Sequence, residues 1–217
     1  MRGSIRVFMS DSLTMTLLPS LMRLLADEAP NLDLRVLVTE DKRRELDRLA
    51  RGEAHLAVGI YSSDRTGLKR RLLWEDGLVL VARADHPLVG LDFGPEALAD
   101  YPHLMQSTRG DDRGRLDARL AEHGLTRRVW LTTPYFASIA RLVAHSDALA
   151  MLPARDAAMW VDLLDLAILP SPFVIPTFRV HAYWDLRYDA DPLQRWVRDA
   201  VVRAAAGMQT PESRAHR

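Results

Sequence analysis

The sequence of 217 residues contains no cysteine, has no net charge and has no long apolar run. The absence of cysteine excludes disulfides and thiolate metal sites, and it fits a protein of the reducing cytoplasm. Lysine and arginine together number 29, as do aspartate and glutamate. Because duplex binding needs a basic face, this balance argues against nucleic-acid binding by the chain alone. The lack of an apolar run that could span a bilayer predicts no membrane partner.

Recognisable catalytic and metal-binding motifs are also lacking. The seven histidines are scattered, without the paired spacing of a metal site. The sequence has no G-x-S-x-G, phosphate-loop or G-x-G-x-x-G motif. The glycine-bearing segment 109–114 is interpreted as a solvated turn, and Arg127-Arg128 as part of a solvated sheet edge. We therefore expect no catalytic residue, no metal and no cofactor, and an enzyme is the least favoured class.

The first part of the chain alternates strand-like and helical segments. An apolar strand, Ile5–Met9, precedes a helix in which leucines recur every four residues on one face, namely Leu13, Leu17, Leu21 and Leu25. An alternating strand, Leu32–Val38, is followed by a helix with Leu46 and Leu49 inward, and then by a strand, Leu56–Ile60. This βαβαβ order predicts a mostly parallel sheet. Two further strand-like runs, 68–74 and 78–82, come next.

A cluster of turn-forming residues at 83–94 interrupts this pattern, and a second βα series follows it. We expect strands at 103–105, 129–132, 149–152, 166–169 and 178–184, helices at 115–123, 135–144 and 155–164, and a final helix at 192–206. Two such series favour two α/β subdomains over one large sheet. A cleft between subdomains, lined by strand ends and helix N-termini, would suit a small molecule.

Five segments in register carry a resemblance to a known family. They read IRVFMSD…LLPSL from Ile5, GEAHLAVGI from Gly52, ADHPL from Ala84, DALAMLP from Asp147, and YWDLRYDADPLQRWVR from Tyr183. Together they resemble the effector-binding domain of LysR-type transcriptional regulators. The last segment, with Thr133-Pro134-Tyr135-Phe136, is similar to the branch of aromatic-responsive and nodulation regulators. One departure is His55, which stands where that family usually has aspartate.

The resemblance implies an α/β, type 2 periplasmic-binding-protein-like fold, with two Rossmann-like subdomains joined by two crossover segments. One subdomain would be residues 1–82 plus 186–217, and the other 83–185, with crossovers near 82–86 and 183–187. The family's N-terminal winged helix-turn-helix is missing from this sequence, so we expect an excised sensor domain that reaches DNA only through that module. The resemblance further implies a cytoplasmic protein, a homodimer, and a tetramer in the full-length form.

The implied function is to bind a small-molecule effector, with an aromatic acid as the expected class, in the cleft between the subdomains, which would change oligomer geometry and transcription. The alternative is a solute-binding protein of a transport system with the same fold. An upstream helix-turn-helix would indicate the regulator, and an upstream secretory signal the transport protein.

Candidate effector contacts lie where strands end and helices begin. At the first junction, hydroxyls and free N–H groups could receive a polar group or simply cap the helix. At the equivalent junction of the second series, aromatic rings could stack on an effector or belong to the core. A polar loop after 103–105 could supply amide and hydroxyl contacts. The candidates are Ser10, Asp11, Ser12, Thr14, Tyr61, Gln106, Ser107, Thr133, Tyr135, Phe136 and Trp184. Ser12, Gln106 and Tyr135 are expected to face one shared cavity.

Overall fold

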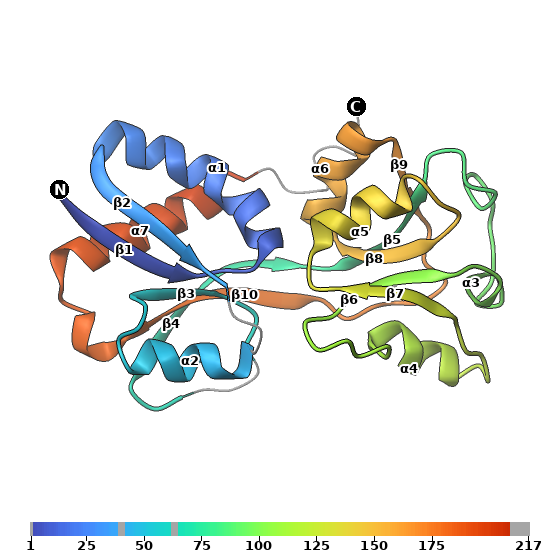
Figure 1. The fold of residues 1–217 in the computed structure, drawn as a ribbon, viewed down its shortest axis with the longest axis horizontal. Coiled ribbons are helices and arrows are strands. Elements are labelled where there is room, and N and C mark those ends of the chain that lie inside the picture. The colour runs from blue at the N-terminus through green and yellow to red at the C-terminus, as the bar shows by residue number, and fades with distance from the viewer. Residues whose placement is uncertain (1, 39–41, 62–64, 209–217) are drawn as a thin grey trace. The chain divides into compact units, whose positions relative to one another are not determined.

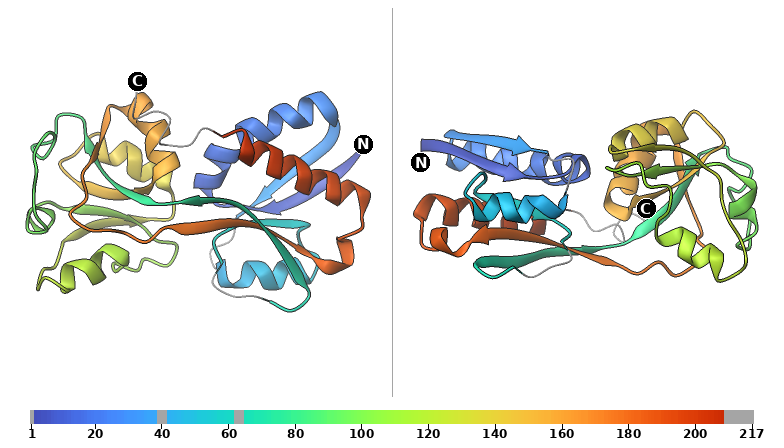
Figure 2. Two further views of the ribbon diagram at one scale, coloured as in Figure 1. Left: turned by 180° about the vertical axis from the view of Figure 1, so that it is seen from behind. Right: turned by 60° about the horizontal axis from the view of Figure 1, so that its bottom comes forward.

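A computed structural model describes residues 2–38, 42–61 and 65–208 (Figure 1). The chain forms two α/β units, each built around its own five-stranded sheet. The chain up to Glu75, together with the segment that starts at Phe178, makes the first unit, and Asp76–Thr177 makes the second. Figure 2 gives two further views of the same ribbons. The predicted two-part α/β architecture is confirmed.

The first unit has the strand order β2-β1-β3-β10-β4. Its elements are β1 (Arg2–Phe8), α1 (Asp11–Glu28), β2 (Asn31–Leu37), α2 (Lys42–Ala50), β3 (Leu56–Gly59), β4 (Leu68–Asp76), β10 (Phe178–Asp185), a 3-10 turn (Leu186–Tyr188) and α7 (Pro192–Ala206). β1 runs parallel to β2 and β3, as the βαβαβ pattern predicts, whereas β10 is antiparallel to β3. The sheet is therefore mixed.

Both faces of the first sheet are covered. Val7 and Phe8 are each 0% exposed, and successive strand residues point to opposite faces, so neither face is open at β1. The leucine stripe of α1 is buried, as predicted. Leu25 belongs to this core at 5% exposure, whereas Met22 is 50% exposed and lies outside the core. α7 packs against α1 and buries Val197, Ala200 and Val201.

The unusual His55 connects β1 to the start of β3. The backbone N–H of Arg6 donates to His55 Nδ1 at 2.9 Å, and the N–H of His55 donates back to the Arg6 carbonyl at 2.9 Å. A carboxylate could accept the first of these bonds equally well. Histidine can thus replace aspartate here as long as Nδ1 carries no proton. Burial, followed by the nearby Arg6, lowers the pKa of His55 and favours that state.

The second unit has the strand order β7-β6-β8-β5-β9. Its elements are β5 (Leu78–Arg83), α3 (Ala97–Asp100), β6 (His103–Gln106), α4 (Arg115–Ala121), β7 (Val129–Thr133), α5 (Phe136–Val143), β8 (Leu149–Pro153), α6 (Ala154–Leu164) and β9 (Leu166–Leu169). β6 is parallel to β7 and β8, and β5 is antiparallel to β8 and β9. One core cluster includes Ile139 and Val143 of α5, and a separate cluster includes Leu116 and Leu120 of α4.

Both unit boundaries come earlier in the chain than the expected 82/83 and 185/186. β5 was expected in the first subdomain, but it pairs with β8 and β9 of the second sheet. β10 was expected in the second subdomain, but it pairs with β3 of the first sheet. Strand pairing decides this membership, and a run of apolar residues does not specify which sheet it will join.

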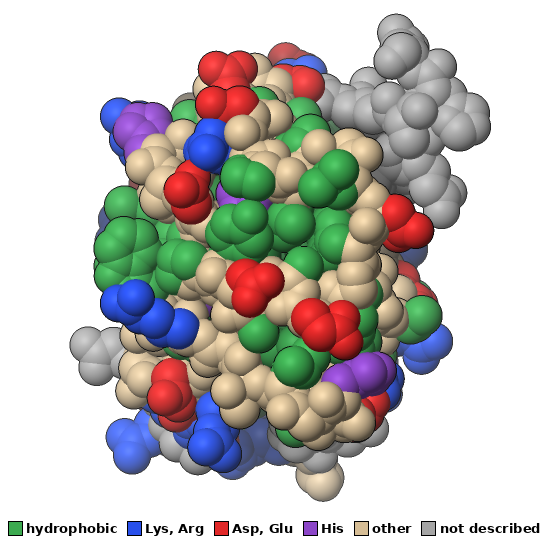
Figure 3. All heavy atoms as spheres, turned by 90° about the vertical axis from the view of Figure 1, so that its right-hand side faces the viewer, with side chains coloured by type: hydrophobic (Ala, Val, Ile, Leu, Met, Phe, Trp, Pro, Cys, Tyr) green, Lys and Arg blue, Asp and Glu red, His purple; other side chains and the backbone are tan. Residues whose placement is uncertain are grey.

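The outer surface of the second unit carries exposed hydrophobic side chains. Figure 3 looks onto the end of this unit that bears α3 and shows hydrophobic groups gathered together, with acidic groups among them. Val89 and Leu91, in the loop after β5, are 39% and 54% exposed. His86 in the same loop is buried, and its Nδ1 accepts from the N–H of Leu88 at 3.1 Å. The His86-Pro87-Leu88 sequence is thus a turn with a packed histidine.

His103 at the start of β6 is fully buried and makes two polar contacts. Its Nε2 lies 2.7 Å from the Leu98 carbonyl, and its Nδ1 lies 3.2 Å from Nη1 of Arg127. The guanidinium can only donate, so Nδ1 accepts and Nε2 carries the proton. Burial and then the charge of Arg127 lower the pKa of His103 to about 4.

This environment predicts a pH dependence of stability. An unfolded histidine titrates near pH 6.5, so between about pH 6.5 and 4 only the unfolded state takes up the proton. The free energy of unfolding should therefore fall as the pH is lowered through this window, by about 3 kcal/mol from His103 alone. In His103→Gln the amide can still donate to Leu98 and accept from Arg127, but it does not titrate. We expect urea unfolding to show a shallower pH dependence for this variant. Parallel profiles for the two proteins would contradict the assignment.

Candidate functional site

A cavity of 390 Å³ lies in the second unit, a size typical of small-molecule pockets. Its wall combines apolar side chains with a polar, arginine-rich loop. The lining residues are Leu78, Leu104, Met105, Gln106, Ser107, Thr108, Arg109, Asp111, Arg113, Gly114, Arg115, Leu116, Arg127, Phe136, Met151 and Ile175. Three of the residues predicted from the sequence, Gln106, Ser107 and Phe136, are thus brought together.

Hydrogen bonds between the ends of two parallel strands position these three residues. Gln106 ends β6, and its side-chain Nε2 donates to the Pro134 carbonyl at 3.3 Å. The backbone N–H of Ser107 donates to the carbonyl of Thr133, the last residue of β7, at 2.9 Å. Phe136 then begins α5. Thr133 and Tyr135 adjoin the cavity in sequence but are not among its lining residues, and Tyr135 is 52% exposed.

The loop after β6 is folded around the Ser107 hydroxyl. Its Oγ accepts from the backbone N–H groups of Arg109 at 3.3 Å and Asp111 at 2.9 Å. Gly110, between them, has φ +76°, a conformation that favours glycine. The Arg109 guanidinium donates to Asp111 Oδ2 at 2.8 Å. The segment is an exposed turn, as expected, and it also forms part of the cavity wall.

A buried ion pair holds α4 against this wall. The Arg127 side chain is only 3% exposed, and its Nε and Nη2 donate to the two carboxylate oxygens of Asp117 at 2.9 and 2.7 Å. Asp117 Oδ2 also accepts from the Gly114 N–H at 2.6 Å, at the first turn of α4. Burial raises the pKa of Asp117, but the bonds from Arg127 and Gly114 outweigh it, so this pKa lies below its usual value. The expectation that Arg127 lies on a solvated edge was wrong, because Asp117 neutralises it inside.

In the first unit, the predicted residues Ser10, Asp11, Ser12 and Thr14 surround the start of α1. Ser10 is the N-cap residue, although its side chain makes no capping bond. The Thr14 hydroxyl donates to the Asp11 carbonyl at 2.6 Å, and Ser12 is buried at 8% exposure. The geometry thus accounts for Thr14 by a local bond within the helix. That Ser12 shares a cavity with Gln106 and Tyr135 stays a prediction.

Tyr61 and Trp184 are each engaged by partners within the first unit. The Tyr61 hydroxyl donates to Glu45 Oε2 at 2.5 Å, and its ring meets Tyr183 edge-on at 5.0 Å. Trp184 is 8% exposed, and its Nε1 donates to Asp189 Oδ1 at 2.9 Å. These bonds engage the Tyr61 O–H and the single Trp184 N–H donor within the first unit, while the Tyr61 oxygen can still accept. That either residue contacts an effector stays a prediction.

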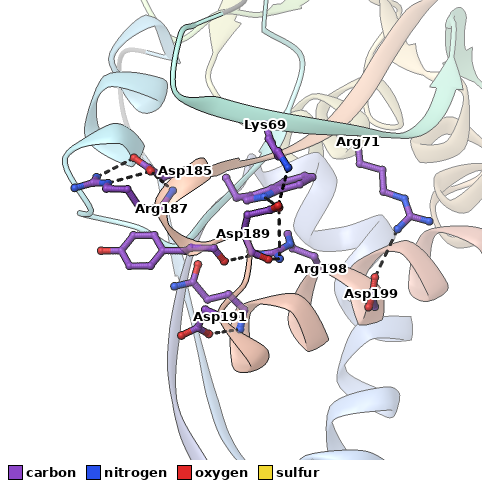
Figure 4. A network of polar contacts seen from close by, with 11 residues as sticks. Lys69, Arg71, Asp185, Arg187, Asp189, Asp191, Arg198 and Asp199 are labelled. Atoms are coloured by element: carbon purple, nitrogen blue, oxygen red, sulfur yellow. Dashed lines mark hydrogen bonds and ion pairs between the residues drawn. The ribbon is translucent and has the colours of Figure 1, made fainter.

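Asp189 is the centre of the polar network around Trp184. Figure 4 shows Lys69 and Arg198 converging on this residue, with Lys69 Nζ 2.6 Å from Oδ2 and Arg198 Nη2 2.7 Å from the backbone carbonyl. The Arg198 guanidinium also lies over the Trp184 ring, 4.9 Å from its centroid. The hydrogen bonds from Lys69 and Trp184 hold the pKa of Asp189 below its usual value. The closing segment, which starts at Tyr183, therefore links β4, β10 and α7 through the contacts of Asp189.

Sequence reasoning missed several lining residues, notably Arg113, Arg115 and Met151. The signal for these residues was the spacing of the arginines at 109, 113 and 115, because a turn alone does not require three cations in seven residues.

Within the described ranges, no group of three or more metal-binding side chains is placed to hold an ion. None of the helices in the described part of the chain is long and apolar enough to cross a membrane.

The chain leaves the first α/β unit after Glu75, forms the second unit and returns to the first at Phe178, which is the arrangement of the type 2 periplasmic-binding-protein class. The family comparison is specific: the model described as "LysR substrate binding domain" matches residues 1–206. The chain belongs to this family, as the five sequence segments indicated.

Similar proteins agree with this assignment. The HTH-type transcriptional activator NahR of Pseudomonas putida is 30% identical over 184 residues, covering 85% of this chain and 61% of NahR. Nodulation protein D 3 of Rhizobium leguminosarum bv. phaseoli is 27% identical, covering 93% and 66%. The regulatory domain of MexT from Pseudomonas aeruginosa, a transcriptional activator, is 27% identical with a TM-score of 0.81, covering 93% and 99%.

These relatives confirm the predicted branch and do not favour the transport alternative. The chain spans a little under two thirds of the length of the two curated relatives. It covers nearly all of the separate MexT regulatory domain. The chain is thus an effector-binding domain of the LysR type.

The buried ion pair makes a prediction about stability. Asp117→Ala would leave the Arg127 charge buried without its carboxylate, which costs about 3 kcal/mol. Arg119→Ala serves as the control, because Arg119 pairs with Glu122 on the exposed side of α4 and such pairs contribute at most about 1 kcal/mol. Urea denaturation at neutral pH measures both. Similar small losses in the two variants would show that the pair does not hold the unit together.

Proposed function

We propose that this domain binds a small aromatic carboxylic acid in the cavity of the second unit, and that its occupancy regulates transcription by the longer protein. The observation that carries the proposal is the composition of the cavity wall. Four arginines and one carboxylate line it, together with Phe136 and a set of aliphatic and thioether side chains. Such a wall suits a ligand that has an apolar body and an anionic group.

The apolar side supports an aromatic body in particular. Phe136 offers a ring at the start of α5, and Met151 on β8 offers a polarizable sulfur. Aromatic rings pair favourably with both kinds of group. Leu78 on β5 and Leu104 on β6 complete the apolar wall from the two strands that flank β8.

Regulation would follow from a difference in effector affinity between conformations of the protein. An effector shifts a conformational equilibrium only by as much as it binds one state better than the other. Within the family's architecture, we propose that this shift acts on a homodimer, with a tetramer in the full-length protein. DNA would be contacted by a separate helix-turn-helix in the cytoplasm, while this domain senses the effector without catalysing a reaction.

Binding of aromatic acids tests the function directly. We expect calorimetry to detect binding of benzoate or salicylate by the wild-type domain, and Phe136→Ala to weaken it by about 5- to 30-fold through loss of ring contact. Leu142→Ala is the matched control, because Leu142 lies on the same helix, is 42% exposed and does not line the cavity. If no aromatic acid binds, the proposed effector class is wrong.

Exposed apolar residues on α1 support the proposed dimer. Met15 and Met22 are 39% and 50% exposed on a helix whose other apolar side chains are mostly in the core. We expect the domain to be a dimer by light scattering and Met22→Glu to shift it toward monomer, since a charge would be buried at the interface. Val174→Glu is the control, because Val174 is 85% exposed in the second unit. A wild-type monomer at high concentration would contradict the proposal.

A further inference from the structure

The four arginines that line the cavity differ in how they are engaged. Arg127 is buried and bound by Asp117 through two hydrogen bonds. Arg109 pairs with Asp111, with Nη2 2.8 Å from Oδ2. Arg115 donates from Nη1 to the carbonyl of Pro176 at 3.0 Å. Three of the four guanidinium groups thus have partners within the protein, and only that of Arg127 is buried.

Arg113 is the exception. It lines the cavity, and it makes no hydrogen bond or ion pair with any residue in 2–38, 42–61 or 65–208. The one carboxylate in the lining, Asp111, already pairs with Arg109 and does not neutralise it. Arg113 is thus an exposed, cavity-lining arginine whose guanidinium donors are not bonded to any described residue.

A second donor at the same wall is the Ser107 hydroxyl. Its oxygen accepts two backbone N–H groups, from Arg109 and Asp111, so its lone pairs are used within the loop. The remaining group is the O–H, which is a donor. Ser107 also lines the cavity. An acceptor from outside the protein would satisfy both Ser107 and Arg113.

We propose that Arg113, assisted by the Ser107 hydroxyl, is the residue that binds the carboxylate of the effector. The inference rests on the function proposed above and assigns the charge recognition to one side chain. A carboxylate has two oxygens in a plane and matches the planar guanidinium fork, which a compact ammonium group does not. Arg127 instead supports the wall and takes no part in binding the anion.

Calorimetry with paired probes tests this assignment. The probes are salicylate and benzoate, with salicylamide and benzamide as uncharged counterparts of the same shape. We expect Arg113→Gln to weaken binding of the two acids by about 10- to 100-fold, as for a lost charge-assisted hydrogen bond, and to change amide binding by less than about threefold. Arg113→Lys keeps the charge but loses the fork, so its loss should be intermediate. Ser107→Ala should cost less than Arg113→Gln.

Two matched variants separate a direct contact from a general charge effect. Arg128→Gln removes an exposed arginine of the same unit that does not line the cavity, and it should leave acid binding unchanged. Arg115→Gln removes a lining arginine that is held by Pro176 and should have the smaller effect. Acid binding by Arg113→Gln within about threefold of wild type, or a larger loss in Arg115→Gln, would overturn the assignment while leaving the effector class intact. Failure of wild type to bind either acid would instead overturn the proposed function, and this inference with it.

Discussion

The candidate site depends on one constraint, the buried ion pair between Arg127 and Asp117. It joins the residue that leads into β7 to the first turn of α4, and through His103 it reaches β6 and the Leu98 carbonyl. A cation that is 3% exposed is tolerated only because a carboxylate and further acceptors surround it. The geometry of the loop 107–114, and hence of the cavity wall, is fixed by this pair and by the Ser107 turn.

The arginines of the cavity lining therefore differ in their partners: Arg109, Arg115 and Arg127 bond to the protein, and Arg113 bonds to no described residue. The buried Arg127 guanidinium cannot exchange its carboxylate partner for a ligand without leaving Asp117 uncompensated. An exposed guanidinium without partners gives up only water when an anion arrives. Proximity to a cavity is therefore a poor guide to a binding role, and the hydrogen-bond inventory of each side chain is a better one.

The sequence predicts the elements of this fold far better than their partners. The four-residue leucine spacing located α1, and the expected bounds of β9 and α7 agree with the structure because periodicity and capping are local signals. The sheet membership of β5 and β10 was misplaced because pairing is settled by tertiary contacts. Arg127 was misread for the same reason, since nothing in a short basic run reveals that Asp117 will pair with it. Gln106, Ser107 and Phe136 could be found because strand ends and helix starts meet at one edge.

The segments that carry the family resemblance and the residues that line the cavity are largely different. Trp184, Asp189 and Arg198 of the closing segment bind one another. His86 contacts Leu88 in its own loop, the Tyr101 ring and the Asp147 carbonyl. At His55 an imidazole nitrogen accepts a backbone bond that a carboxylate could also accept, so either residue type fits this position. These segments stabilise the shared fold.

The loop after β6 is under no such constraint at Arg113, so a relative could replace this side chain without loss of stability. Differences in effector charge within the family should therefore be encoded in this loop more than in the segments by which the family is recognised.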